Sequence, residues 1–187
     1  MDAIEHHLPN ADVYIMRQYV KNTAYVLEYL RTHLNWTRDG LPSSPAYCNL
    51  GTNYLASSGK FRMGQEIDPL VFELMNQLNH EFNVAMNSCF AMLYETNQAE
   101  LLYRRHPTPS LDPDQPILTL FYGEPSVVKL KEMSSAEEFE FLLQDGDLLI
   151  MPDRCQQNYF NAIKKSDQCT TPRLLLTFRR FNLGLFY

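Results

Sequence analysis

The chain has 187 residues, 45% of them hydrophobic, and a formal net charge of -6. This length and composition suit one domain, residues 1–187, with a well-buried core. The acidic balance argues against a protein whose main affinity comes from neutralising phosphates, because that mode needs clustered Lys and Arg. The four cysteines form no C-x-x-C pair and have no histidines at zinc-site spacing, so the sequence indicates neither a redox motif nor a structural zinc.

The sequence gives no sign of a membrane-spanning or secreted protein. No apolar run approaches the roughly 18 residues that a membrane span requires, and the start of the chain lacks a basic stretch followed by an apolar one. We therefore expect an intracellular protein, cytoplasmic or nuclear, with reduced thiols and no membrane partner.

Two amphipathic helices are expected in the first half of the chain. The first begins at about Asn22 or Thr23 and continues to Leu34, with apolar residues at helical spacing. The second begins at Asp68-Pro69, where Asp can cap the helix and Pro suits its first turn, and ends near residues 79–80. Each helix has one apolar face with which it can pack on a core.

Short apolar or alternating runs follow from Phe82 onward, separated by Pro, Gly, Asp and Ser. The runs PILTLFYG, GDLLIM and PRLLLTFRRF are typical of strands, whereas residues 106–116 hold four prolines and predict a loop. The acidic residues 134–140 favour a solvated turn. Helices first and strands after them predict an α+β fold in which the strands close into a sandwich or jelly-roll and the N-terminal helices pack outside.

The last strands resemble the AlkB family of 2-oxoglutarate- and Fe(II)-dependent dioxygenases, which repair or demethylate nucleobases on a double-stranded β-helix core. Residues 146–151 read GDLLIM, residues 156–163 read QQNYFNAI, and residues 173–179 read RLLLTFR. The family pattern is GDLL-hydrophobic-M, then Q-x-x-Y-x-H-x-I, then R-x-x-x-T-F-R. Of the residues that these three patterns specify, only the histidine is missing.

The resemblance continues upstream, more loosely before about Asn87. Residues 87–94, NSCFAMLY, resemble the family's F-N-S-C-L-x-N-x-Y strand, and residues 116–123 resemble its P-I-x-S-x-S-hydrophobic-G strand. Residues 47–51 with Tyr54 and Gly59 resemble the lid that presents a tyrosine to a flipped base.

The iron site that this resemblance implies lacks its ligands. Non-haem iron oxygenases hold Fe(II) with two histidines and a carboxylate. An ungapped match from Asn87 places Arg104 at the first histidine, His106 at the aspartate and Asn161 at the distal histidine. A two-residue gap would make His106 the first histidine, but Thr108 would then replace the carboxylate. An arginine repels a divalent cation, so we expect no bound metal, no catalytic residue and no required cofactor.

The 2-oxoglutarate pocket is better preserved. In the family, two arginines bind the carboxylates of the cosubstrate, and they resemble Arg173 and Arg179, with Tyr94 at the matching tyrosine. Met92 and Leu175 stand where the family has asparagines. A buried guanidinium is costly unless paired. Either the two arginines still bind an anion or carboxylates of the protein pair with them, and we favour the second interpretation.

These observations predict a catalytically inactive AlkB-like pseudoenzyme that binds or scaffolds a protein through the former active-site face. Tyr54 is either a base-stacking residue of a substrate lid or an aromatic that covers the core, and we favour the cover. Two alternatives stay open. One is an active nucleic-acid dioxygenase with unorthodox ligands, which the retained arginines would favour, and the other is a metal-free, weak binder of single-stranded nucleic acid.

Overall fold

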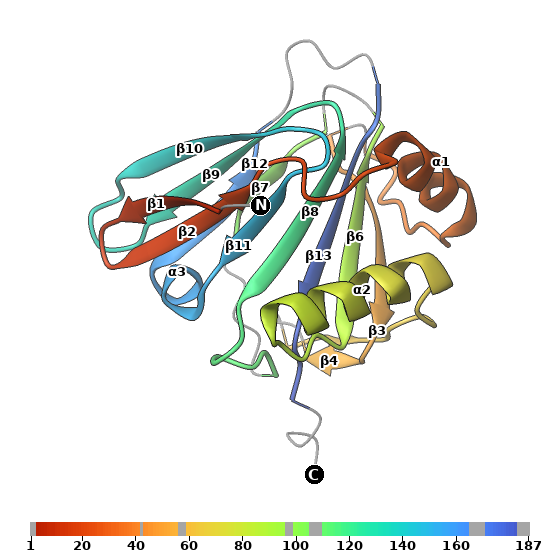
Figure 1. Cartoon of the computed structure of the whole chain (residues 1–187), viewed down its shortest axis with the longest axis horizontal. Helices are drawn as coiled ribbons and strands as arrows, with labels where there is room; N and C mark the ends of the chain where they lie inside the picture. Colours follow the sequence, from red (N-terminus) through yellow and green to blue (C-terminus); the bar gives the residue numbers. More distant parts are fainter. Residues whose placement is uncertain are drawn as a thin grey trace.

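The fold is built from two facing antiparallel sheets. A computed structural model describes residues 3–41, 43–55, 59–95, 99–104, 110–164 and 171–182. The seven-stranded sheet has the order β1 (Ile4–Leu8), β2 (Ala11–Met16), β11 (Leu148–Met151), β8 (Ile117–Gly123), β13 (Arg173–Arg179), β6 (Ser88–Tyr94) and β3 (Ala46–Gly51) (Figure 1). The four-stranded sheet has the order β10 (Glu138–Leu143), β9 (Ser126–Glu132), β12 (Tyr159–Ile163) and β7 (Leu101–Arg104). A third, two-stranded sheet pairs β4 (Tyr54–Leu55) with β5 (Phe61–Arg62).

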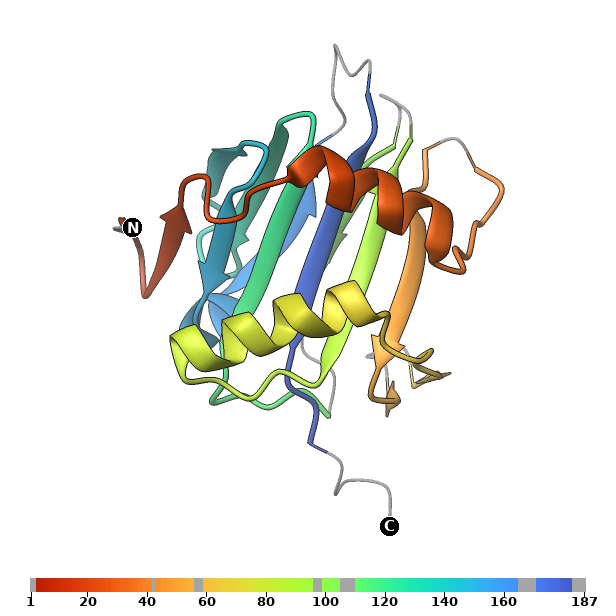
Figure 2. The same ribbon diagram turned by 45° about the vertical axis from the view of Figure 1, so that its right-hand side comes forward.

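Two helices cover the outer face of the large sheet. Figure 2 shows α1 (Thr23–His33) and α2 (Pro69–Phe82) lying across that face. Leu30 of α1 and Val71 of α2 are fully buried in the core between the helices and this sheet. This arrangement confirms the expected jelly-roll with N-terminal helices packed outside. None of the helices in the described part of the chain has the length and apolar character to cross a membrane.

The ends of the helices follow local chemistry. Asp68 caps α2 as expected, because its carboxylate accepts a hydrogen bond from the Leu70 amide at 2.9 Å. The helix runs to Phe82, past the expected end at residues 79–80, and stops where Asn83 adopts a left-handed conformation, with φ of 50°. Asn22 precedes α1 but makes no side-chain cap, because its own backbone is left-handed, with φ of 55°.

The large sheet separates two cores, and β13 faces both. Leu174 and Leu176 belong to the core under the helices, whereas Leu175 belongs to the core between the sheets. Because side chains alternate along a strand, Thr177 and Arg179 lie on the same side of β13 as Leu175. This alternation directs the polar residues of the C-terminal motif into the space between the sheets.

The acidic segment expected as a solvated turn is only partly a turn. Residues 133–135 form a turn, but β10 begins at Glu138 and pairs with β9. Lys129 contacts both Glu138 and Glu140 across the pair, at 3.4 and 3.0 Å. These cross-strand charges let an acidic sequence form a strand while Phe141 is buried. The β1–β2 hairpin was likewise not predicted.

Candidate functional site

Two positions that the resemblance places at iron ligands meet in the structure. Arg104 of β7 and Asn161 of β12 are direct partners across the antiparallel pair. The ungapped match therefore brings together residues that are far apart in the sequence. His106, the third position, lies outside the described residues.

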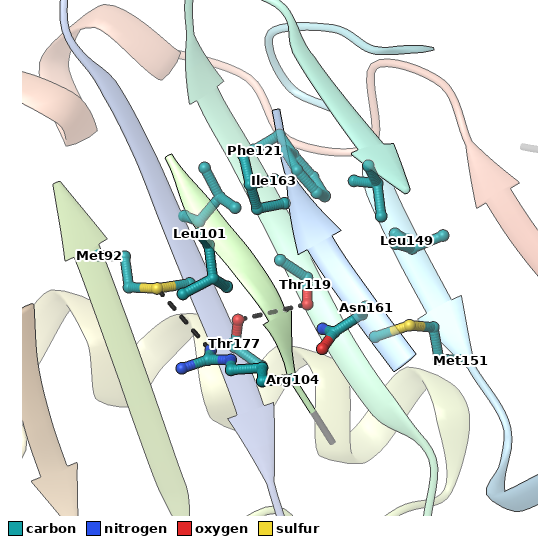
Figure 3. Close-up of a pocket in the computed structure, with 12 residues that line it drawn as sticks. Met92, Leu101, Arg104, Thr119, Phe121, Leu149, Met151, Asn161, Ile163 and Thr177 are labelled. Carbon is teal, nitrogen blue, oxygen red and sulfur yellow. Dashed lines mark hydrogen bonds between the residues drawn. The ribbon is translucent and has the colours of Figure 1, made fainter. Parts of the chain in front are cut away.

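A small cavity lies between the two sheets, and both residues line it. Its volume is about 20 Å³. Figure 3 shows Arg104, Asn161, Thr119 and Thr177 pointing into the same space, surrounded by apolar side chains. The apolar lining residues are Met92, Leu101, Phe121, Val128, Leu149, Met151, Ile163 and Leu175. The cavity exceeds the roughly 10–15 Å³ that one water molecule needs, and both sheets contribute polar groups to its lining.

Arg104 brings a positive charge to the wall of this cavity. Its Nη2 donates to the sulfur of Met92 at 3.8 Å, and its guanidinium carbon lies 5.3 Å from the centre of the Phe90 ring. Its buried Nε has no hydrogen-bond partner among the described residues. Burial lowers the pKa of Arg104 to about 10, and the charge of Arg179 acts in the same direction. The side chain stays protonated at neutral pH.

Two threonines from neighbouring strands add hydroxyl groups. Thr119 of β8 and Thr177 of β13 are paired in the sheet, and the Thr119 hydroxyl donates to the Thr177 oxygen at 3.4 Å. The Thr177 hydroxyl hydrogen is therefore free to point toward another acceptor in the cavity.

Arg173 is fully buried and is satisfied mainly by backbone oxygens. It donates to the carbonyl of Ala99 at 3.0 Å and to that of Lys164 at 3.2 Å. Its guanidinium also lies 4.7 Å from the centre of the Tyr94 ring, so the expected neighbours Arg173 and Tyr94 do meet. The contacts are those of a cation held by carbonyl dipoles and a ring face.

Arg179 lies in a cage of three aromatic rings. Its guanidinium is 5.5 Å from the ring centre of Tyr54, 5.4 Å from that of Phe90 and 5.2 Å from that of Phe181. The residue is only 5% exposed, and its Nε and Nη2 are buried without a hydrogen-bond partner. Cation–π attraction to these rings thus offsets part of the cost of burying the Arg179 charge.

These contacts differ from the carboxylate pairing that we favoured for the two arginines. Within the described residues, neither Arg173 nor Arg179 forms an ion pair. Carbonyl groups and aromatic rings take the place of acidic side chains. The space between the sheets therefore holds three guanidinium groups with no described carboxylate paired to them.

Tyr54 closes the end of the site that holds Arg179. Its ring stacks on Phe181 at 4.4 Å with an interplanar angle of 8°, and its hydroxyl donates to Asn49 Oδ1 at 3.0 Å. The residue is 7% exposed. In this arrangement Tyr54 covers the site, and one face of its ring is already occupied. Residues 47–51, which the resemblance matches to the lid, lie in the edge strand β3.

A separate group of possible ligands lies on the β1–β2 hairpin. Atoms of Glu5, His7 and Asp12 lie within 4.8 Å of one another. The Nδ1 of His7 is 2.8 Å from Asp12, whereas its Nε2 is 3.9 Å from Glu5. One ligand atom from each of the three residues therefore lies within the spacing that a bound cation needs, on a hairpin away from the cavity between the sheets. The hydrogen bond to Asp12, aided by the charge of Glu5, raises the pKa of His7.

The sequence prediction missed four residues of the site. Phe90 and Phe181 flank Arg179, while Thr119 and Thr177 supply the hydroxyl groups. The threonines had a visible signal, because each interrupts an otherwise apolar strand. No comparable signal marks the two phenylalanines, because aromatic residues are common in apolar strands.

No family model and no curated protein matches the chain. Among solved structures, that of OsALKBH1, an AlkB homologue, superposes with a TM-score of 0.67 and 13% sequence identity. The match covers 95% of this chain and 100% of the other. At this identity the similarity concerns the fold, and function has to be argued from the site. The chain has an AlkB-like jelly-roll fold.

Proposed function

We propose that this chain is a catalytically inactive AlkB-like domain that acts as a protein-binding or scaffolding module. The observation that carries the proposal is the pairing of Arg104 with Asn161 at the wall of the small cavity. A protein fold can persist after its chemistry is lost, because the core and the site depend on different residues.

The residues present do not fit Fe(II). An iron site of this kind needs two imidazoles and a carboxylate. Arg104 offers only donors and a positive charge, and the asparagine side chain of Asn161 is a weak, neutral ligand. The Arg104 side chain lines this cavity, so its positive charge would oppose any cation placed there. Repulsion between like charges is strong in a poorly hydrated interior.

The cavity does not fit 2-oxoglutarate either. Ligand sites for small molecules typically enclose about 300–1,000 Å³. This cavity has a volume of about 20 Å³, and Met92 and Leu175 line it where polar groups would be needed to orient a dicarboxylate. Arg173 already donates to two carbonyl groups, and Arg179 lies inside its aromatic cage.

The first prediction concerns metal and cosubstrate. Adding Mn(II) or Fe(II) with 2-oxoglutarate should leave the melting temperature within about 1 °C of the value in a chelator, because Arg104 and Asn161 do not offer the ligands that iron needs at the cavity wall. A ligand at 100 times its dissociation constant would instead add about 2.7 kcal/mol to the native state, or roughly 5–10 °C for a chain of this size. Such a shift, or about one iron per purified chain by elemental analysis, would contradict the proposal.

The surface proposed for a protein partner surrounds the β4–β5 hairpin, which also carries Tyr54. Phe61 is 52% exposed and Met63 is 67% exposed, although both are large and apolar. Two such residues close together in the sequence are typical of a docking surface more than of a solvated loop. Because Tyr54 lies over Arg179, this hairpin belongs to the face where the former active site would open.

A second candidate function is weak binding of single-stranded nucleic acid. Phe61 lies between Lys60 and Arg62, and an exposed aromatic between two cations can stack on a base while the cations contact phosphates. The net charge of -6 keeps this candidate second, because the electrostatic part of such binding is small when the whole chain repels phosphates.

One pair of variants separates the two candidates. Phe61→Ser with Met63→Ser should abolish specific capture of the protein partner from the native source, whereas Phe72→Ser, an exposed aromatic on α2, should not. Fluorescence anisotropy with labelled single-stranded RNA and DNA tests the other candidate. Binding that weakens steeply with salt, together with unchanged protein capture by the double variant, would favour the nucleic-acid function.

An intracellular location is part of the proposal. Cys48, Cys89 and Cys155 are buried and free, as expected for reduced thiols. Burial raises the pKa of the Cys155 thiol to about 12, so it stays protonated and unreactive. Buried free thiols of this kind are usual in compartments that keep cysteines reduced.

A further inference from the structure

The space between the sheets contains more positive charge than its described neighbours compensate. Arg104 and Arg179 lie 5.3 and 5.4 Å from the centre of the same Phe90 ring. Buried guanidinium nitrogens of both residues have no acceptor among the described residues. A buried charge without a partner is costly, and aromatic rings supply only part of the compensation. An additional negative charge close to Arg104 would therefore stabilise the fold.

The cavity beside Arg104 has the groups that hold a small anion. Arg104 has a buried Nε that is free to donate, and the Thr177 hydroxyl accepts from Thr119 while keeping its own hydrogen. The rest of the wall is apolar, which removes competing water and strengthens an ionic contact. Within the described residues no carboxylate lines the cavity, so nothing there repels an anion.

We propose that this cavity binds one compact monovalent anion of the halide class, with Arg104 and Thr177 as its donors. The volume of about 20 Å³ selects the class, because it holds one water-sized species and excludes phosphate, sulfate and dicarboxylates. Chloride is only slightly larger than a water molecule and carries a single charge. The anion lies where the fold family would bind a metal cation. The charge of the ligand is negative here because Arg104 makes the wall of the cavity positive.

Thermal unfolding in different sodium salts at equal ionic strength tests this site. A halide at ten times its dissociation constant favours the native state by a factor of about eleven, which raises the melting temperature by about 3–6 °C for a chain of this size. Chloride and bromide should give this rise relative to gluconate, which is too large to enter. In crystals grown in bromide, an anomalous scattering peak should lie beside Arg104.

Variants separate specific binding from general salt effects. Arg104→Met should abolish the difference between halide and gluconate, whereas Arg154→Met, on an exposed residue of α3 (Asp153–Asn158), should retain it. Should Arg104→Met fail to fold, Thr119→Val with Thr177→Val removes both hydroxyl groups together and leaves neither unpaired. That double variant should weaken the halide effect at least tenfold in concentration.

Equal melting temperatures in all salts for the wild type, or a halide effect that survives in these variants, would overturn the anion site. The inference rests on the proposed function only through the absence of iron from this wall. Failure of the anion site can be distinguished from failure of the proposed function. If the melting temperature of the wild type responds to neither halide nor metal, only the anion site is refuted. A response to metal with 2-oxoglutarate refutes both.

Discussion

Asp147→Ala should lower the free energy of unfolding by about 2–4 kcal/mol, although the residue lies in a motif that resembles a catalytic family. Asp147 is fully buried and forms an ion pair with Arg17 Nη1. Its carboxylate also accepts from the backbone amides of Gln18 at 3.1 Å and Gln144 at 2.7 Å. The substitution leaves all three donors without their acceptor at the point where β2 meets β11.

Chemical denaturation with urea measures this loss, and two variants calibrate it. Asp114→Ala, on an exposed residue, should change the free energy by no more than about 0.5 kcal/mol. Asp147→Asn keeps the shape of the side chain and one acceptor oxygen. Its loss of unfolding free energy should therefore lie between those of Asp147→Ala and Asp114→Ala. If Asp147→Ala were as mild as the control, the carboxylate would not be what joins the strands, and the motif would need another explanation.

The sequence predicted most of the fold because periodicity and capping are local. The start of α2 follows from Asp68 and Pro69 alone, and the strand nature of β13 follows from a run of apolar residues. The hairpins β1–β2 and β9–β10 were missed because one strand of each, β1 or β10, lies at the edge of its sheet and carries charges that resemble those of a loop. In β10, the pattern becomes that of a strand only once Lys129 on the neighbouring strand is known.

The arrangement around the arginines was harder to predict. Arg173 donates to the carbonyls of Ala99 and Lys164, and a backbone carbonyl leaves no trace in the amino-acid sequence. Our expectation of carboxylates followed from the rule that buried charges are paired, and that rule does not say which group is the partner. The aromatic cage around Arg179 could not be predicted from the sequence either, because its three rings come from separate segments of the chain.

Charge links the proposed loss of catalysis to the proposed anion. A jelly-roll with an iron centre balances a divalent cation against carboxylates, whereas here Arg104 contributes a permanent single charge at that wall. A cation covalently attached to β7 cannot dissociate, so the site requires an anionic or aromatic partner at all times. The Phe90 ring beside Arg104 supplies an aromatic partner, and the small cavity has room for the proposed anion.

Restoring the family's ligands at the three positions should make the site prefer a metal cation to an anion. We expect Arg104→His with His106→Asp and Asn161→His to bind Mn(II) or Fe(II) at least 100-fold more tightly than the wild type. Two imidazoles and a carboxylate replace a cation and a neutral amide, and the direct pairing of positions 104 and 161 brings the two imidazoles to one wall. Replacing the long guanidinium by an imidazole also enlarges the cavity beside Thr177.

Isothermal titration with Mn(II) measures the gain. The matched control carries the same substitutions at 104 and 161 but His106→Asn in place of His106→Asp, which keeps the size of the side chain and removes its charge. The control should bind at least tenfold more weakly than the charged variant, because the anionic oxygen is the ligand that neutralises the ion. The charged variant should in addition lose the stabilisation by halide, since its cavity no longer has a cationic wall. A folded charged variant that binds no metal would show that positions 104, 106 and 161 do not converge on one point, and the loss of catalysis could then no longer be attributed to these three substitutions.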